Sequence, residues 1–500
     1  MARVIGDWLE SAAQRAPGRP AVVGDAGSVN YVQLADRTRR VAGWMQRSGI
    51  RRGDRVLVLL PSCLELVETV LGASRLGACF VVINPAIKPY QLAHVLADCE
   101  PRLVVTVSTR PDLDLLPRDG GLLLVDRDWD RVLAGPASPV VSAPISNDLA
   151  CLVYTSGSTA MPKGVMSAHR NVVFAAQAIQ ERLRIRADDV IGHFLPMSFD
   201  YGLYQLFLSL QAGATLALGT EEDAGYALLR KVRDWGVTGL PLVPNLAASL
   251  VRLARRSADE LPALRFVTNT GAHLPGGVIA DIRAIWPSCS VFPMFGLTEC
   301  KRVSILLPEE YERKPASVGR PLPDTECLVV DEAGSPLPPG QEGELVVRGQ
   351  HVMPGYWRSE ELTALRFRPW GPQRERVLFT GDRCSLDADG YLYFHGRLDD
   401  VFKQRGYRVS ALEVEAAGMR LTGVREAALV VGGGNGSGPD TVLAYVGEAG
   451  PEAVRDGLRA LLEDYKLPDR VVACADLPRN TNGKVDKRAL VERLLTEVPA

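Results

Sequence analysis

The chain has 500 residues, of which 46% are hydrophobic and 23% are charged. This length exceeds what one compact core accommodates, and the composition excludes a disordered, collagen-like or disulfide-scaffold protein. Lysines and arginines number 57 against 59 aspartates and glutamates, a net charge of -2, so no positive excess favours nucleic acid or acidic lipid as a partner.

The N-terminal segment MARVIGDWLESAAQRAP contains acidic residues and no uninterrupted apolar stretch. It predicts a short amphipathic helix and not a signal peptide. Apolar runs such as 56–60 are far shorter than the roughly 20 residues that a membrane-spanning helix requires. The nine cysteines are scattered singly, without zinc-site spacing, and predict reduced thiols. We therefore expect a cytoplasmic protein that does not span a membrane.

Between about residues 50 and 220, short Val/Leu/Ile runs such as RVLVLL, CFVVIN and ACLVYTS alternate with longer helical patterns. This alternation is typical of βαβ units that build a parallel sheet. The same pattern resumes at 239–244, 264–268 and 290–294, which predicts a second α/β lobe. From about 317 to 400, strands broken by turn residues predict an antiparallel β subdomain.

The remaining residues, after Gly396, have a different pattern. Two strand-like segments, EAALVVGG and VLAYVG, are followed by a helical segment near 452–464 and by the polar loop PRNTNGKVDKRAL. This combination predicts a small α+β domain. The expected fold class is thus an α/β, multi-lobed large N-terminal domain, with two α/β lobes plus a β subdomain, followed by a small α+β C-terminal domain.

The most informative segment is YTSGSTAMPKG at 154–164, a Ser/Thr/Gly run that leaves a predicted strand and ends in a lysine. Glycines let backbone amides approach an anion, the hydroxyls of Ser156, Ser158 and Thr159 can donate to phosphate oxygens, and Lys163 supplies positive charge. The spacing is not that of G-x-x-x-x-G-K-[ST], and ordinary polar loops have a similar composition. Taken alone, the segment leaves a phosphate cradle and a polar loop equally open.

Four further motifs follow in the chain, and together the five resemble the adenylate-forming superfamily of acyl-CoA synthetases, amino-acid adenylation domains and luciferases, most closely a stand-alone adenylation enzyme. The resemblance spans nearly the whole chain. Its motifs are YTSGSTAMPKG (154–164), FGLTEC (295–300), TGD (380–382), GRLDD with RGYR (396–400 and 405–408), and NTNGK (480–484). The chain departs from the family at Ala160, where a second glycine is usual; a methyl group there should not abolish phosphate contact.

The resemblance implies ATP and Mg²⁺ as cofactors. Joining a carboxylate to ATP brings two anions together, so the site must supply positive charge. By resemblance, Lys163 and the hydroxyl loop hold the β- and γ-phosphates, Thr298 contacts the α-phosphate and Glu299 binds the metal. The cofactor-binding residues implied are Thr155, Ser156, Gly157, Ser158, Thr159, Lys163, Gly271, Ala272, Phe295, Gly296, Thr298, Asp382, Arg397 and Lys484.

Within that set, Asp382 is expected to accept hydrogen bonds from both ribose hydroxyls, because one carboxylate can do so in a bidentate manner. Phe295 offers a flat face for adenine, and Arg397 resembles the family's arginine at the ribose and phosphate edge.

The small domain is expected to be mobile. The resemblance implies a large domain at 1–398 and a small domain at 399–500 that carries Lys484, which joins Lys163, Thr298 and Glu299 as a catalytic residue for adenylation. Asp399 matches the hinge position, where the small domain rotates to admit a thiol, and Gly406 matches the thiol tunnel.

The acid is expected to be a small carboxylic or amino acid. Asp200 occupies the place at which amino-acid-activating members keep an aspartate for the substrate ammonium, although it could equally cap the following helix. Lys301 and Arg302 add positive charge nearby, or form a solvated charged turn. The predicted substrate-pocket residues are Phe199, Asp200, Tyr201, Tyr204, Met294, Arg302 and Val303.

The acceptor stays open, because coenzyme A and a carrier protein present the same phosphopantetheine thiol. We expect no attached carrier domain, because the segment after Lys484 does not supply the Ser-bearing helix of one. We therefore expect an acyl or peptidyl carrier protein supplied in trans, in a biosynthetic pathway. The alternatives are an AMP-forming acyl-CoA synthetase that uses free coenzyme A, or adenylation of an unusual oxyacid with a non-thiol acceptor. A phosphotransferase would instead release ADP.

Overall fold

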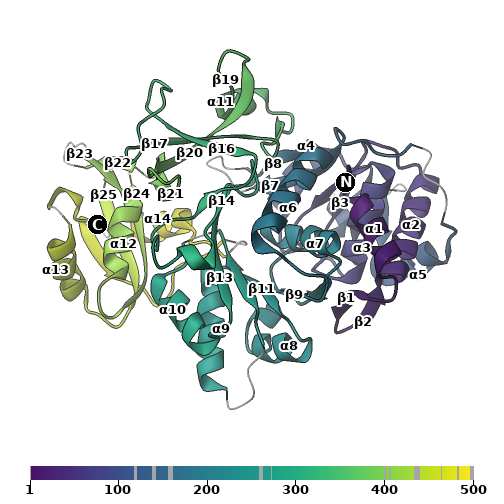
Figure 1. Ribbon diagram of the computed structural model, residues 1–500, viewed down its shortest axis with the longest axis horizontal. Helices are drawn as coiled ribbons and strands as arrows, with labels where there is room; N and C mark the ends of the chain where they lie inside the picture. Colours follow the sequence, from purple (N-terminus) through teal and green to yellow (C-terminus); the bar gives the residue numbers. More distant parts are fainter. Residues whose placement is uncertain are drawn as a thin grey trace. The chain divides into compact units, whose positions relative to one another are not determined.

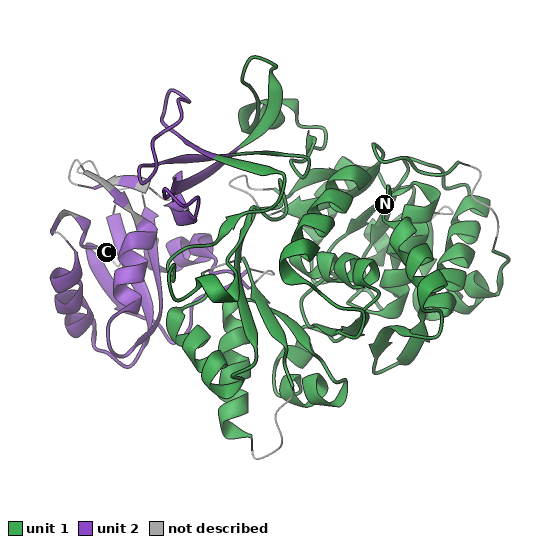
Figure 2. Ribbon diagram, in the orientation of Figure 1, with its two compact units in different colours: residues 1–327, 347–378 green, residues 328–346, 379–500 purple. Residues whose placement is uncertain are grey.

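The computed structural model describes residues 2–117, 121–137, 142–155, 161–257, 263–271, 273–398, 401–404, 407–432, 440–462, 464–480 and 483–495. The chain divides into two compact units, unit 1 at 1–327 with 347–378 and unit 2 at 328–346 with 379–500 (Figure 2). Among the helices of the described ranges, none combines the length and apolar character needed to cross a bilayer. The predicted domain boundary at 398/399 stays a prediction.

Unit 1 contains two large sheets (Figure 1). In the first, the central strands β7, β4, β3, β5 and β6 are parallel, whereas β18 and β8 are antiparallel to their neighbours. In the described residues its order is β18 (Gly355–Tyr356), β8 (Lys163–Ala168), β7 (Leu149–Thr155), β4 (Cys79–Val82), β3 (Arg55–Val58), β5 (Leu103–Thr106) and β6 (Leu122–Leu124).

The second sheet is also parallel at its centre, from β13 to β1, with antiparallel strands at both edges. Its order in the described residues is β15 (Arg320–Pro321), β14 (Ser304–Ile305), β13 (Ser290–Phe295), β12 (Phe266–Asn269), β11 (Gly239–Leu242), β9 (Val190–His193), β10 (Thr215–Leu218), β1 (Pro20–Gly24) and β2 (Gly27–Asn30).

Helices join the two sheets into one body. Helix α6 packs on β7 and β8 of the first sheet, α7 packs on β9 and β10 of the second, and the two helices contact each other. One hydrophobic cluster accordingly contains buried residues from both sheets. The helices of unit 1 are α1 (Gly6–Arg15), α2 (Tyr31–Arg47), α3 (Leu64–Leu76), α4 (Pro89–Cys99), α5 (Val125–Ala134), α6 (His169–Leu183), α7 (Asp200–Ala212), α8 (Leu228–Asp234), α9 (Pro244–Arg256), α10 (Gly276–Ile285) and α11 (Glu360–Arg366).

The predicted antiparallel β subdomain is present as a third sheet, and its strands β17 and β20 run from one unit into the other. Its strands are β16 (Thr325–Val330), β17 (Glu342–Gly349), β19 (Phe367–Trp370), β20 (Glu375–Leu386) and β21 (Leu392–Arg397). Unit 2 continues with β22 (Val401–Gln404), β23 (Tyr407–Ser410), α12 (Ala411–Met419), β24 (Val424–Gly432), β25 (Asp440–Gly447), α13 (Pro451–Leu461), β26 (Arg470–Ala473) and α14 (Lys487–Leu495).

Helix α7 matters most for the site, and its ends follow from the sequence. Phe199 is extended, and its carbonyl accepts the first helical hydrogen bond, from Leu203. Gly213 ends the helix in the left-handed region at φ 73°, which glycine adopts without steric cost. The first residue of α7 is therefore Asp200, at the carboxyl-end loop of β9 in the second sheet, where ligands bind in open parallel sheets.

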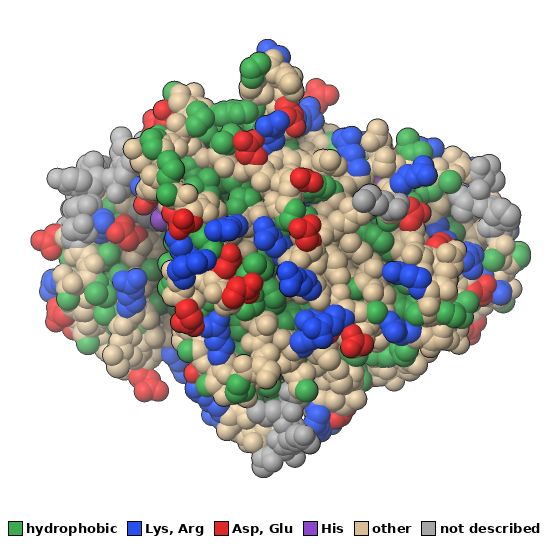
Figure 3. Space-filling view, viewed as in Figure 1, with side chains coloured by type: hydrophobic (Ala, Val, Ile, Leu, Met, Phe, Trp, Pro, Cys, Tyr) green, Lys and Arg blue, Asp and Glu red, His purple; other side chains and the backbone are tan. Residues whose placement is uncertain are grey.

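Charged side chains of both signs are interspersed over the visible face of the described residues (Figure 3). This distribution agrees with the net charge of -2.

Candidate active site

The Ser/Gly-rich motif connects β7 to β8, which pair antiparallel with Thr155 opposite Lys163. The strand ends therefore hold both sides of the loop. The Thr155 hydroxyl is buried and has no hydrogen-bond partner among the described residues, so it is available to an oxygen-rich ligand. The centre of the loop, 156–160, lies outside the described residues, and with it the predicted contacts Ser156, Gly157, Ser158 and Thr159.

The FGLTEC motif forms the loop between β13 and β14. The amide of Val303 donates to the carbonyl of Phe295 at 2.9 Å and closes the loop. A Cβ at Gly296 would lie 2.2 Å from the Lys301 carbonyl oxygen, so this approach requires glycine. Lys301 has a φ of 63°, a left-handed conformation that costs free energy for a lysine. The loop is therefore tight, and it presents its side chains in more than one direction.

Glu299 and Lys163 meet through a residue that the sequence did not single out, Tyr356. The Tyr356 hydroxyl donates to Glu299 Oε1 at 2.6 Å, and Lys163 Nζ lies 3.4 Å from that hydroxyl and 4.4 Å from the ring centroid. Tyr356 reaches this place because β18 pairs with β8, with Tyr356 opposite Val165. The available signal was the short run PGYW, a buried aromatic after a Pro-Gly turn, which has no chemical signature of its own.

Glu299 is the carboxylate predicted to bind Mg²⁺. Within the described ranges, no group of three or more His, Cys, Asp or Glu side chains is arranged to hold a metal ion. Mg²⁺ commonly takes one or two carboxylates and fills its other positions with substrate phosphates and water. One carboxylate, positioned by Tyr356 beside Lys163, fits a magnesium ion that arrives together with a nucleotide.

Three other residues predicted to line the nucleotide, Gly271, Phe295 and Thr298, lie at or after neighbouring strand ends of the second sheet. Phe295 and Thr298 are half-buried at the end of β13 and in the loop after it. Gly271 follows β12 with a φ of 88°, and a Cβ there would lie 3.6 Å from the Phe199 ring. Gly271 therefore lies close to Phe199 of the predicted acid pocket, whereas its neighbour Ala272 lies outside the described residues.

The predicted acid pocket is assembled at the start of α7. Tyr201 is buried, and its hydroxyl lies 2.6 Å from Thr268 Oγ1 of β12; the Tyr204 hydroxyl is buried without a partner among the described residues. Met294 and Val303, on β13 and before β14, are buried as well. Burial raises the pKa of both tyrosines, so their hydroxyls stay protonated.

Asp200 does not cap α7 through a side-chain hydrogen bond, because the cap residue is Phe199 and no capping contact is made there. The Asp200 side chain is 12% exposed, and its Oδ2 lies 3.9 Å from Lys301 Nζ. Lys301 and Arg302 are not a solvated turn: their exposed fractions are 3% and 6%. The structure thus brings one carboxylate and two cations together beside Tyr201 and Tyr204.

In unit 2, Asp382 and Arg397 are opposite each other on β20 and β21, and their side chains form an ion pair at 3.0 Å. Asp382 is 2% exposed, and its strand is held by a hydrogen bond of 2.8 Å from the Thr380 hydroxyl to the Leu345 carbonyl. Arg397 is 44% exposed. The carboxylate of the pair is therefore buried in the sheet, whereas the guanidinium is exposed.

Lys484 lies between β26 and α14, on an exposed turn of unit 2. The Lys484 amide donates to Asn480 Oδ1 at 3.1 Å, and the Asn480 amide donates to the Lys484 carbonyl at 2.8 Å. Gly483 adopts a φ of 75°, which the turn requires. Main-chain atoms of Lys484 thus take part in both hydrogen bonds to Asn480. The predicted hinge Asp399 and thiol-tunnel residue Gly406 lie outside the described residues.

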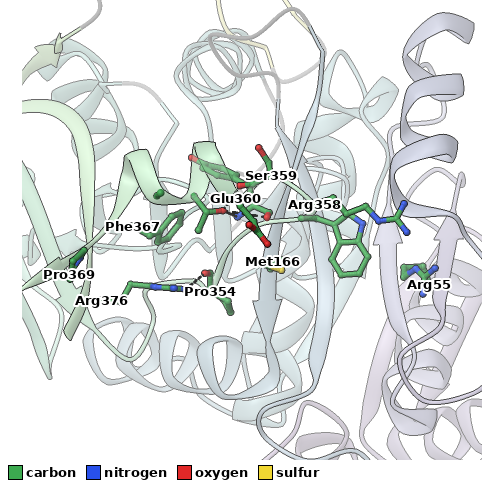
Figure 4. A pocket seen from close by; sticks show the side chains of 13 residues that line it. Arg55, Met166, Pro354, Arg358, Ser359, Glu360, Phe367, Pro369 and Arg376 are labelled. Carbon is green, nitrogen blue, oxygen red and sulfur yellow. Dashed lines mark hydrogen bonds between the residues drawn. The ribbon is translucent and has the colours of Figure 1, made fainter. Parts of the chain in front are cut away.

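A pocket of about 720 Å³ lies in unit 1, with Tyr356 among its lining residues (Figure 4). Its lining includes Trp357, Arg358 and Phe367, and Arg376 points at the Pro354 carbonyl, to which it donates at 2.6 Å. Of the described residues that line this pocket, only Tyr356 also contacts the candidate site. The pocket is lined mainly by residues of β18, α11 and their neighbours, and not by the residues predicted to carry the chemistry.

The fold and these motifs define the class of protein. The AMP-binding enzyme family matches residues 9–357, and the AMP-binding enzyme C-terminal domain matches residues 413–484. The chain therefore belongs to the AMP-binding enzyme family. It is an AMP-forming ligase that activates acids as adenylates, which confirms the predicted family and enzyme class. Enzymes of this family use ATP and Mg²⁺.

Among curated relatives, the chain is 29% identical to a dimodular nonribosomal peptide synthase of Bacillus subtilis over 97% of its own length, but it spans only 21% of that protein. It is 30% identical to novobiocin biosynthesis protein H of Streptomyces niveus, over 99% of this chain and 84% of that protein. Relatives thus include both segments of large synthetases and a protein of similar length.

Two solved structures are also similar. The complex of VinN with L-aspartate is 38% identical and covers 79% of this chain and 99% of that one, with a TM-score of 0.72. ATP-bound MatB from Rhodopseudomonas palustris is 26% identical and covers 98% of both chains, with a TM-score of 0.88. The predicted fold class, a two-lobed α/β large domain followed by a small C-terminal domain, is confirmed.

Proposed function

We propose that this enzyme activates a small amino acid as its adenylate and then transfers the aminoacyl group to the phosphopantetheine thiol of a free-standing carrier protein. In the first step an oxygen of the substrate carboxylate attacks the α-phosphorus of ATP, and the bond to the bridging oxygen of the β-phosphate breaks to release pyrophosphate. In the second, the thiol sulfur attacks the carbonyl carbon, its proton is lost, and AMP leaves.

The proposal that the substrate is an amino acid rests on Asp200. Its side chain is only 12% exposed, and it starts helix α7 next to the buried Tyr201 and one turn before the buried Tyr204. Lys301 Nζ lies 3.9 Å from this carboxylate, beyond hydrogen-bonding distance, so a substrate ammonium can donate hydrogen bonds to Asp200 directly. The solved complex of the relative VinN with an amino acid, L-aspartate, supports the same substrate class.

For the nucleotide, we propose that Lys163 and the hydroxyl loop, with Thr155, Ser156, Gly157, Ser158 and Thr159, hold the terminal phosphates. Mg²⁺, when bound, supplies positive charge to the departing pyrophosphate. Glu299 would hold this ion, oriented by the hydrogen bond of 2.6 Å from Tyr356. Thr298 would contact the α-phosphate, Phe295 would stack on adenine, and Gly271, Ala272 and Gly296 would line the nucleotide.

For the ribose, we propose that Asp382 accepts hydrogen bonds from both hydroxyls. Its ion pair with Arg397 at 3.0 Å orients the carboxylate, which is 2% exposed. We further propose that Lys484 neutralises the charge that develops between carboxylate and phosphate, that Asp399 is the hinge between domains at 1–398 and 399–500, and that Gly406 lines the thiol path.

Two relatives favour a carrier protein in trans. The chain matches a small segment of the dimodular nonribosomal peptide synthase and most of novobiocin biosynthesis protein H. Free coenzyme A is the alternative thiol. Both acceptors end in the same phosphopantetheine group, so the choice depends on a second surface that only a protein would contact.

The test is ATP–pyrophosphate exchange over a panel of amino, aryl and fatty acids, followed by single-turnover transfer to a holo carrier protein or to coenzyme A. We expect exchange with amino acids, AMP as the stoichiometric product, and faster transfer to the carrier. ADP as the product would refute adenylation by this site. Equal or faster transfer to coenzyme A would refute the carrier and leave the adenylation step standing.

A further inference from the structure

The acid pocket contains two buried cations whose charge is not balanced by the protein. Lys301 is 3% exposed and Arg302 is 6% exposed. Lys301 Nζ and Arg302 Nε are buried without a hydrogen-bond partner among the described residues. Lys301 is also held in the left-handed region at φ 63°, so the loop bears a conformational cost to turn it inward.

The nearest carboxylate is Asp200, at 3.9 Å from Lys301 Nζ, which is beyond hydrogen-bonding distance. Arg302 Nη1 donates to the neutral hydroxyl of Thr270 at 2.6 Å. The cations also face tyrosine rings, Lys301 that of Tyr204 at 5.5 Å and Arg302 that of Tyr201 at 5.3 Å. A ring attracts a cation but carries no net negative charge. One carboxylate therefore faces two cations.

An uncompensated charge inside a protein is strongly unfavourable. Burial accordingly lowers the pKa of Arg302, although nearby groups such as Tyr201 and Asp200 raise it. A guanidinium nevertheless stays protonated in proteins. Such a site gains most from an anion, and a guanidinium beside an ammonium is the arrangement that recognises a carboxylate.

We infer that Lys301 and Arg302 bind a second carboxylate of the substrate, so that the acid activated is a short dicarboxylic amino acid. This inference rests on the proposed function and names its substrate class. The substrate ammonium pairs with Asp200, one carboxylate pairs with Lys301 and Arg302, and the other carboxylate is left to attack the α-phosphorus. All charges of the pocket and substrate then cancel, whereas a monocarboxylic amino acid would leave one positive charge uncompensated.

The pocket also limits the length of this substrate. Asp200 Oδ2 and Lys301 Nζ are only 3.9 Å apart. The predicted pocket residues Met294 and Val303 are buried, and the rings of Phe199 and Tyr201 meet edge to face at 6.0 Å. Groups this close leave the ammonium and second carboxylate sites near each other. The two groups of the substrate must therefore be separated by few bonds, as in aspartate and its close analogues.

The experiment is ATP–pyrophosphate exchange with L-aspartate, L-asparagine, L-glutamate, succinate and β-alanine, for the wild type and for Lys301→Met and Arg302→Met. L-Asparagine has nearly the shape of L-aspartate but lacks the second charge. We expect kcat/KM for a dicarboxylic amino acid to exceed that for its amide by about 100-fold or more, and each variant to lose that preference. Lys231→Met is the matched control, because Lys231 is a partly buried lysine that pairs with Asp25 and Asp223 elsewhere in unit 1.

A second readout separates binding from stability. Without ligand, we expect Lys301→Met to keep or raise Tm, because it removes an uncompensated buried charge, whereas Lys231→Met lowers Tm by breaking two ion pairs. L-Aspartate should raise Tm of the wild type and of Lys231→Met but not of Lys301→Met. A loss of Tm in Lys301→Met equal to that of the control would make Lys301 structural and overturn the inference.

Two outcomes of the exchange assay distinguish the two levels of the proposal. Exchange that is fastest with a monocarboxylic acid, with a preference that Lys301→Met and Arg302→Met leave unchanged, overturns the inference but not the adenylation of an acid. Release of ADP in place of pyrophosphate overturns both.

Discussion

The hydroxyl of Tyr356, on strand β18, donates a hydrogen bond of 2.6 Å to Glu299, in the loop between β13 and β14 and 57 positions away in the chain. The same hydroxyl lies 3.4 Å from Lys163 Nζ. Tyr356 thus holds the proposed metal ligand and the proposed phosphate ligand in one arrangement before any nucleotide binds. Preorganisation of this kind lowers the cost of orienting charged groups during the reaction.

We therefore predict that Tyr356→Phe lowers kcat of ATP–pyrophosphate exchange by about 10-fold and raises the Mg²⁺ concentration needed for half-maximal rate, since a hydrogen bond to a charged group is lost. A magnesium titration measures both effects. Tyr31→Phe is the control. It likewise removes a buried hydrogen bond, the one of 2.6 Å from the Tyr31 hydroxyl to the Ala214 carbonyl, but at a place away from Glu299. An unchanged magnesium dependence in Tyr356→Phe would make this tyrosine a packing residue.

The second prediction concerns Lys484. Because its turn is held by backbone and Asn480 contacts, Lys484→Ala should fold and bind ATP as the wild type does. We expect adenylate formation to fall by about 100-fold or more, as when a charge-stabilising group is removed, while thioester formation from a supplied adenylate survives. Rapid-quench assays of each half-reaction measure these rates. Parallel loss of both half-reactions and of ATP binding would indicate a structural lysine.

The third prediction concerns the ammonium site. Asp200→Ala removes the carboxylate opposite the substrate ammonium, so exchange with amino acids should fall by about 100-fold or more. Exchange with simple acids that lack the ammonium should persist, because α7 does not depend on Asp200 for its cap. Comparing L-aspartate with succinate in the exchange assay separates these effects. Equal activity of the variant and wild type toward amino acids would remove the ammonium role.

The fourth prediction concerns stability against pH. Burial lowers the pKa of His169, His193 and His351 to about 4 each. In the unfolded chain a histidine titrates near about 6.5, so between these values the unfolded state binds more protons. The free energy of unfolding should therefore fall as pH falls below about 6.5, by up to about 1.4 kcal/mol per pH unit for each histidine.

Urea unfolding at pH 7.5 and pH 5 measures this slope. His351→Gln should reduce the slope, because His351 is fully buried with both ring nitrogens lacking a hydrogen-bond partner among the described residues. A slope that is the same in the variant would mean that His351 is protonated in the folded state as well.

Much of the fold and of the candidate site was predictable from local patterns. The alternation of strand and helix patterns predicted the two α/β lobes. The run from Tyr154 to Gly164 predicted a segment that leaves a strand, and the structure has the strand end there, with Thr155 paired to Lys163. Such features are encoded within a few consecutive residues, so sequence alone expresses them. The roles of these residues stay predictions.

Tyr356 and the burial of Lys301 were not predictable in this way. Tyr356 reaches Glu299 only because the two-residue strand β18 pairs with β8, a contact between distant segments with no periodic signal. Lys301 follows Glu299 in a charged run that is usually solvated, and only the left-handed turn at Lys301 directs its side chain inward. Both depend on tertiary packing, which overrides local preference.

The tight loop between β13 and β14 has a consequence for retargeting the enzyme to other acids. Glu299, Lys301 and Arg302 share this one turn, and the contact of Gly296 with the Lys301 carbonyl leaves no slack in it. Replacing the turn to accommodate a new side chain would displace the carboxylate meant for the metal as well. Tyr201 and Tyr204 belong to α7 and not to this turn, so redesign should start there and keep a ring face opposite Arg302 and Lys301.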